Sequence, residues 1–96
     1  MRLRIFDLQI DDWNEEEAAR HNVTEQEIRQ VLDNTPIFLP NKKRHAAPVI
    51  MIGPTYGGRF LTVPLRPTDI QGIWRPATAF PSSDGEIARY EAAGGS

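Results

Sequence analysis

The chain has 96 residues, of which 40% are hydrophobic and 25% charged, and it has no cysteine. This size suits one domain with a modest core, and the lack of cysteine excludes disulfides, thiol chemistry and thiolate metal sites. The net charge of −2 conceals a segregation. Residues 36–82 carry six basic side chains against one acidic one, whereas residues 1–35 carry nine acidic against four basic. A basic middle in an acidic domain predicts a site for a polyanion.

The N-terminal segment predicts a short strand and then a short helix. Apolar residues alternate imperfectly between positions 3 and 10, which indicates the strand. Asn14 is followed three residues later by Glu17, a pairing typical of a helix N-terminus. We expect this first helix to end near Asn22, because asparagine tolerates the left-handed backbone of a helix end.

A second helix is predicted directly afterwards. Thr24 and Glu27 form another capping-box pattern, and Pro36 marks where the helix has ended. Between these signals an apolar stripe repeats at helical spacing, formed by Ile28, Val31 and Leu32.

The middle of the chain predicts an antiparallel sheet of about four strands. The expected strands cover residues 37–39, 49–52, 59–66 and 73–80. Pro64 and Pro76 each lack a donor for the ladder, so they favour edge positions or bulges. Ser83 and Glu86 then predict a last short helix through about Tyr90. The fold class is therefore α+β, with two N-terminal helices and a short C-terminal helix packed on the sheet.

The chain is expected to form a single domain over residues 1–91, with a flexible tail at 92–96. The N-terminus lacks the apolar run of a signal peptide, and no stretch approaches the roughly 20 apolar residues of a membrane span. We therefore expect a cytoplasmic protein without membrane contact.

Two arginines are the first candidates for chemistry. Alternation places Arg59 on one face of its strand and Arg75 on one face of the next. If these strands pair, the two guanidiniums share a face and can bind a phosphate and stabilise its transition state. The alternative is that each arginine pairs with a carboxylate of the acidic helices.

A second group of candidates is the basic run Lys42, Lys43 and Arg44, followed by His45. It is either a clamp for backbone phosphates or a solvated loop, and His45 is its titratable member. His21 is either a residue capping the first helix or a catalytic base. The two histidines are 24 positions apart and no spacing matches a metal site, so neither a metal nor a cofactor is expected.

Several segments together resemble the BrnT-like toxins of bacterial type II toxin–antitoxin systems. The resemblance covers roughly residues 5–90, and its parts are Trp13-Asn14-Glu15, Ala19-Arg20-His21-Asn22-Val23-Thr24, Met51-Ile52-Gly53-Pro54-Thr55, Gly58-Arg59-Phe60-Leu61-Thr62-Val63, Trp74-Arg75-Pro76-Ala77-Thr78-Ala79 and the closing Glu86…Arg89-Tyr90.

The resemblance implies a RelE-like fold and an endoribonuclease that cleaves mRNA without metal and inhibits translation. In that chemistry the ribose 2′-hydroxyl attacks the adjacent phosphate, which Arg59 and Arg75 hold and neutralise. His21, His45 or Arg89 would assist proton transfer or binding, with Lys42, Lys43, Arg44 and Arg89 contacting RNA. The resemblance also implies a cognate antitoxin, usually a small DNA-binding protein. The oligomeric state stays open between a homodimer and a toxin–antitoxin hetero-oligomer.

The sequence departs from the family in one segment that matters. Where the family strand continues into basic residues, this chain has Thr78-Ala79-Phe80-Pro81. This loss favours an alternative function, a catalytically degenerate toxin-like module that engages a protein partner.

Overall fold

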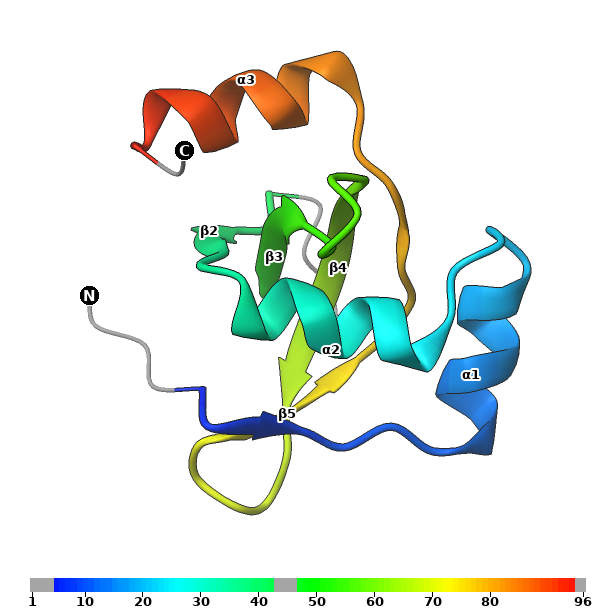
Figure 1. Ribbon diagram of the computed structural model, residues 1–96. Coiled ribbons are helices and arrows are strands. Elements are labelled where there is room, and N and C mark those ends of the chain that lie inside the picture. The colour runs from blue at the N-terminus through cyan, green and yellow to red at the C-terminus, as the bar shows by residue number, and fades with distance from the viewer. Residues whose placement is uncertain (1–4, 43–46, 95–96) are drawn as a thin grey trace.

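One mixed β-sheet carries three helices in the described part of the chain, residues 5–42 and 47–94 of a computed structural model (Figure 1). The helices are α1 (Asp12–Ala19), α2 (Glu25–Asp33) and α3 (Asp84–Ala92). The strands are β1 (Asp7–Leu8), β2 (Ile37–Pro40), β3 (Val49–Pro54), β4 (Phe60–Pro67), β5 (Ile73–Pro76) and β6 (Phe80–Pro81). The α+β class expected from the sequence is confirmed.

The order of the strands differs in detail from the expected sheet of about four antiparallel strands. The path is β1-β5-β4-β3-β2, with β6 paired to β4 beyond the end of β5. Strands β2 to β5 are antiparallel neighbours, as expected, but β1 lies parallel to β5. The sheet is therefore mixed, and it has six strands in the described residues because β1 joins it and the last expected strand is divided in two.

The core lies between α2 and one face of the sheet. Leu61, Val63 and Leu65 alternate along β4 and are fully buried. Helix α2 crosses in front of β3 and β4 in Figure 1 and contributes Ile28 and Val31 to the same cluster. The alternate residues of β4, such as Pro64 and Arg66, lie on the opposite face, which we call the outer face.

A one-residue shift of register separates β5 from β6. Leu65 of β4 lies opposite Pro76, and Thr62 of β4 lies opposite Phe80. Thr62 is three residues before Leu65, whereas Phe80 is four residues after Pro76. The extra residue makes a bulge, which the two prolines had suggested. Because a bulge reverses the alternation of side chains, Ala79 is buried in the core while Arg75 lies on the outer face.

The local signals for α2 and α3 are confirmed. Thr24 accepts from the backbone of Glu27 while the Glu27 side chain accepts from the backbone of Thr24, which completes a capping box. Ser83 and Glu86 make the same reciprocal pair at the start of α3. Helix α1 begins before the position expected, so Asn14 lies inside it rather than capping it.

The turn from α1 to α2 depends on Asn22. Its φ is 60°, the left-handed conformation predicted for the end of the first helix. The following amide, of Val23, donates to the carbonyl of Ala18 at 3.2 Å, which closes the turn. Val23 is thereby placed in the core beside Ile28.

Helix α3 packs at one end of the sheet, above β3 and β4 in Figure 1. Tyr90 is buried there, with its ring 5.2 Å from that of Phe60 and its hydroxyl donating to the carbonyl of Thr35 at 3.0 Å. Among the described residues, no helix has the length and apolarity that crossing a membrane requires.

Candidate functional site

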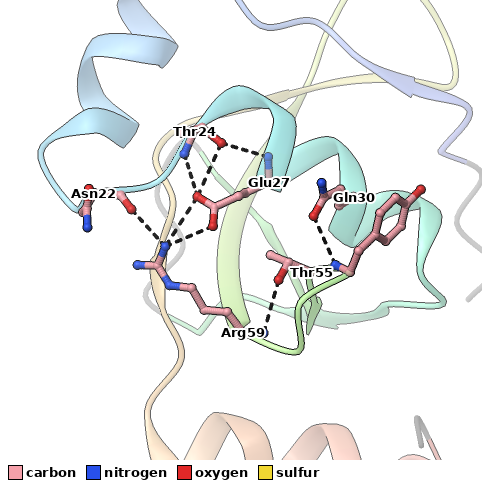
Figure 2. A network of polar contacts seen from close by, with 7 residues as sticks. Asn22, Thr24, Glu27, Gln30, Thr55 and Arg59 are labelled. Carbon is pink, nitrogen blue, oxygen red and sulfur yellow. Dashed lines mark hydrogen bonds and ion pairs between the residues drawn. The ribbon is translucent and has the colours of Figure 1, made fainter.

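Arg59, the first candidate, is bound into a network that joins α2 to the start of β4 (Figure 2). Its Nη1 donates to the carbonyl oxygen of Asn22 at 2.9 Å and lies 3.2 Å from Oε2 of Glu27. The side chains of Arg59 and Glu27 are 35% and 26% exposed. The arginine thus spans from the sheet to the N-terminus of α2 on the core-facing side.

The same network continues into the β3–β4 hairpin. Oγ1 of Thr55 accepts from the amide of Arg59 at 3.2 Å, and Oε1 of Gln30 accepts from the amide of Tyr56 at 3.1 Å (Figure 2). The Tyr56 hydroxyl also donates to Asp33. These contacts fasten the hairpin to α2, so the surroundings of Arg59 are those of a structural ion pair.

The charge state of Glu27 reflects this position. Its pKa lies below the ordinary value of 4.5, first because the backbone N–H of Thr24 donates to its carboxylate. The guanidinium of Arg59 lowers it further, whereas partial burial opposes both effects. The ionised form of Glu27 is therefore favoured by the fold.

Arg75 lies elsewhere, and the structure does not bring the two arginines together. On β5 it sits directly opposite Arg66, near the end of β4, whereas Arg59 precedes the beginning of that strand. Seven residues of extended chain separate Arg59 from Arg66, roughly 23 Å. The two candidates also lie on opposite faces. The expected shared face is therefore corrected, since the bulge after Pro76 breaks the alternation on which it rested.

Each of the two arginines has a carboxylate partner, which the sequence left open as an alternative. The guanidinium of Arg75 is paired with Asp11, in the segment between β1 and α1. The carboxylate of Glu27 serves Arg59 in the same way. Both carboxylates come from the acidic first third of the chain, so part of the charge segregation is resolved by contacts inside the fold.

A groove of about 370 Å³ lies between α3 and the outer face, and we call it the α3 groove. Its floor includes Ile50 and Pro64, neighbours across β3 and β4. Lys42 lines it from the end of β2, and Arg89 from α3. Two expected RNA-binding residues that are 47 positions apart in the sequence therefore meet at one hollow.

The polar and aromatic lining of this groove adds side chains that sequence reasoning did not assign. Glu86 contributes a carboxylate from α3, and Phe80 contributes a ring from β6. Thr62 and Ser82 are hydrogen-bonded through their hydroxyls at 2.8 Å, which ties β4 to the segment leading into α3. The sequence indicates Glu86 only as a capping residue of the last helix. It indicates Phe80 only as part of the segment that differs from the BrnT-like toxins. Their lining of one hollow depends on the β6 register, which sequence alone does not give.

Lys42 and Arg89 differ from the strand arginines in their partners. Both are exposed, and within residues 5–42 and 47–94 neither makes an ion pair. Their positive charges are therefore available to an anionic ligand in the groove.

His21 lies beside the groove rather than in it. Its ring packs edge-on against Phe80, with 6.0 Å between centroids, and it follows α1 in the turn before Asn22. Lys43, Arg44 and His45 lie outside the described residues. In the part of the chain that the structure describes, no group of three or more acidic or histidine side chains is placed to hold a metal ion.

No protein-family model matches this chain, and no curated protein is similar to it. The geometry of the site therefore carries the functional argument.

Proposed function

We propose that this chain binds single-stranded RNA in the α3 groove and cleaves it without a metal, as the toxin of a type II toxin–antitoxin pair with a RelE-like fold. The observation that carries the proposal is the convergence of Lys42 and Arg89, both without a carboxylate partner among the described residues, on one groove. Backbone phosphates supply the anions that such cations bind.

The aromatic lining supports a nucleic acid over a simple anion. Phe80 offers a ring beside the two cations, and base stacking on an aromatic ring tolerates any sequence. His21 packs against that ring and acts here as a positioning residue. A phosphate on Arg89 and a base on Phe80 together fit one nucleotide of a single strand.

The proposed reaction uses the carboxylate of the groove. The ribose 2′-oxygen forms a bond to the adjacent phosphorus while the bond from phosphorus to the 5′-oxygen breaks. Glu86 takes the proton of the 2′-hydroxyl, and the leaving 5′-oxygen takes a proton from water, so the products carry a 2′,3′-cyclic phosphate and a 5′-hydroxyl. Lys42 and Arg89 stabilise the extra negative charge on the phosphoryl oxygens.

This assignment moves the chemistry away from Arg59, which serves stability. It also places the antitoxin, a small DNA-binding protein encoded alongside, over the α3 groove, where its acidic side chains would compete with RNA.

The test compares growth, RNA binding and RNA cleavage for the parent chain and two groove variants. Lys42→Ala/Arg89→Ala is expected to lose RNA binding, and Glu86→Gln to lose cleavage while still binding, because glutamine keeps the capping box. Arg20→Ala is the control, since Arg20 is 70% exposed and pairs with Glu17, its neighbour on the helix surface. The proposal fails if the parent chain neither binds RNA at about 50 mM salt nor arrests growth.

A module that binds a protein without catalysis is the second candidate. Phe6 and Ile70 are 68% and 65% exposed and lie on adjacent segments, because the amide of Phe6 donates to the carbonyl of Gly72. An apolar pair at the β1 edge suits a protein partner. This candidate predicts that the parent chain does not cleave RNA, whether or not it arrests growth. It also predicts that Phe6→Ala loses binding of the protein partner while its RNA binding is unchanged.

A further inference from the structure

Arg66 and Arg75 lie directly opposite one another on the outer face, in the pairing of β4 with β5. Like charges opposite one another in a sheet repel, so the arrangement favours an anion between them. Asp11 neutralises part of the charge of Arg75. The guanidinium of Arg75 nevertheless has five N–H donors in a planar fork, more than the carboxylate of Asp11 occupies.

A second hollow lies at this pair. Its volume is about 520 Å³, and both arginines line it together with Thr68 and Gln9. Asp69 lies at its rim and is exposed. The hollow thus brings two guanidiniums together beside the carboxylates of Asp11 and Asp69, and their planar N–H forks are donors that suit a phosphate.

The two hollows are neighbours on one face. Pro64 forms part of the floor of the α3 groove, and Arg66, two residues further along β4, lines the second hollow. Residues two apart in a strand point to the same side and are about 7 Å apart. An extended strand of nucleic acid that occupies the first hollow therefore reaches the second without turning.

We propose that Arg66 and Arg75 form a second phosphate site, and that single-stranded RNA runs along β4 from the α3 groove to this pair. The path of the RNA rests on the proposed function. The phosphate site at Arg66 and Arg75 does not depend on it. The inference assigns Arg75 to binding the strand outside the reacting phosphate, and it adds Arg66, which the sequence did not single out.

One experiment measures RNA affinity against length for the parent chain and Arg66→Ala. Oligoribonucleotides of about 2 to 10 nucleotides begin below, and reach well into, the range of about 4 to 16 nucleotides known for the sites of single-strand-binding domains. The affinity of the parent chain is expected to rise with length until the second hollow is reached. Arg66→Ala is expected to bind the shortest RNAs equally well but the longest about threefold to tenfold more weakly, with a salt slope smaller by about one.

Arg66→Lys is the matched variant that keeps the charge and loses the fork, and it is expected to recover the salt slope but only part of the affinity. A second experiment needs no RNA. Inorganic phosphate, compared with chloride at equal ionic strength, is expected to raise the unfolding temperature of the parent chain and of the control Arg20→Ala more than that of Arg66→Ala.

The outcomes separate the two proposals. If no RNA binds but phosphate stabilises the parent chain through Arg66, the proposed function fails and the second site stands. If long RNA binds Arg66→Ala as tightly as the parent chain, and phosphate stabilises both equally, the second site is overturned.

Discussion

Nη1 of Arg59 lies 3.2 Å from Oε2 of Glu27, and this ion pair joins the start of β4 to the N-terminus of α2. The same nitrogen donates to the carbonyl of Asn22, in the turn that leads into α2. An arginine that sequence pattern associated with phosphate is thereby committed to a contact between two elements of the fold. The ion pair gives Arg59 a measurable role in stability that is independent of RNA.

Replacing Arg59 by alanine is expected to lower the free energy of unfolding by about 1–2 kcal/mol, because a charged hydrogen bond and a half-buried ion pair are lost together. Arg20→Ala removes an exposed pair and is expected to cost less than about 0.5 kcal/mol. Urea denaturation of both variants measures the difference. A variant at Arg59 that lost RNA binding but kept full stability would contradict this role.

The stability that Glu27 contributes depends on pH. Its pKa in the folded protein lies below the ordinary 4.5, so its ionised form stabilises the fold above that pH, and this contribution is lost as the pH falls through the folded pKa. Glu27→Gln keeps an acceptor for the cap but not the charge. The difference in the free energy of unfolding between the parent chain and this variant is expected to be constant near neutral pH and to become smaller below about pH 4.5. Urea denaturation across pH measures it, and a difference that became larger in acid would contradict the prediction.

Local sequence signals predicted the helices better than the sheet. Thr24 and Ser83 meet their glutamates three residues on, so each capping box is determined within one turn of chain. The opposition of Arg66 and Arg75 depends instead on how far β4 slides along β5. One bulge residue before Phe80 changes which side chains share a face, and the sequence indicates a bulge near Pro76 without fixing its position.

For the candidate site too, the sequence indicates the residue types but not which of them lie together. Lys42 and Arg89 were identified as basic residues, but nothing local shows that the end of β2 and α3 border one hollow. The carboxylate partners of Arg59 and Arg75 come from distant segments, so the sequence left two alternatives that only tertiary contacts decide.

Arg89 and Phe80 are expected to contribute to RNA binding through different physical terms. Arg89→Ala removes one phosphate contact, so it is expected to weaken binding and reduce the slope of log affinity against log salt by about one. This is measured by anisotropy of a labelled RNA between about 50 and 200 mM salt. An unchanged slope in Arg89→Ala would place this side chain outside the RNA contact.

Phe80→Leu is expected to weaken RNA binding by about 1–3 kcal/mol with the salt slope unchanged, because stacking on the ring is lost and no charge is removed. The same titrations measure it. The ring also contacts His21, so the unfolding free energy of this variant is measured alongside. If affinity falls only in proportion to a loss of folded protein, Phe80 packs rather than stacks on a base.

Gly72 tests how the β1 edge is held to the rest of the sheet. Its φ is +90°, and a Cβ there would collide with the ring of Phe6, whereas Gly58 has the same φ with nothing within 4 Å of a Cβ. Gly58→Ala is expected to cost about 1–2 kcal/mol from backbone strain, and Gly72→Ala about 1–2 kcal/mol more from the collision. Denaturation of Phe6→Ala with and without Gly72→Ala isolates the contribution of the collision. In the Phe6→Ala background, Gly58→Ala and Gly72→Ala should lower the free energy of unfolding by the same amount. If Gly72→Ala still costs more there, the collision is not with the ring of Phe6.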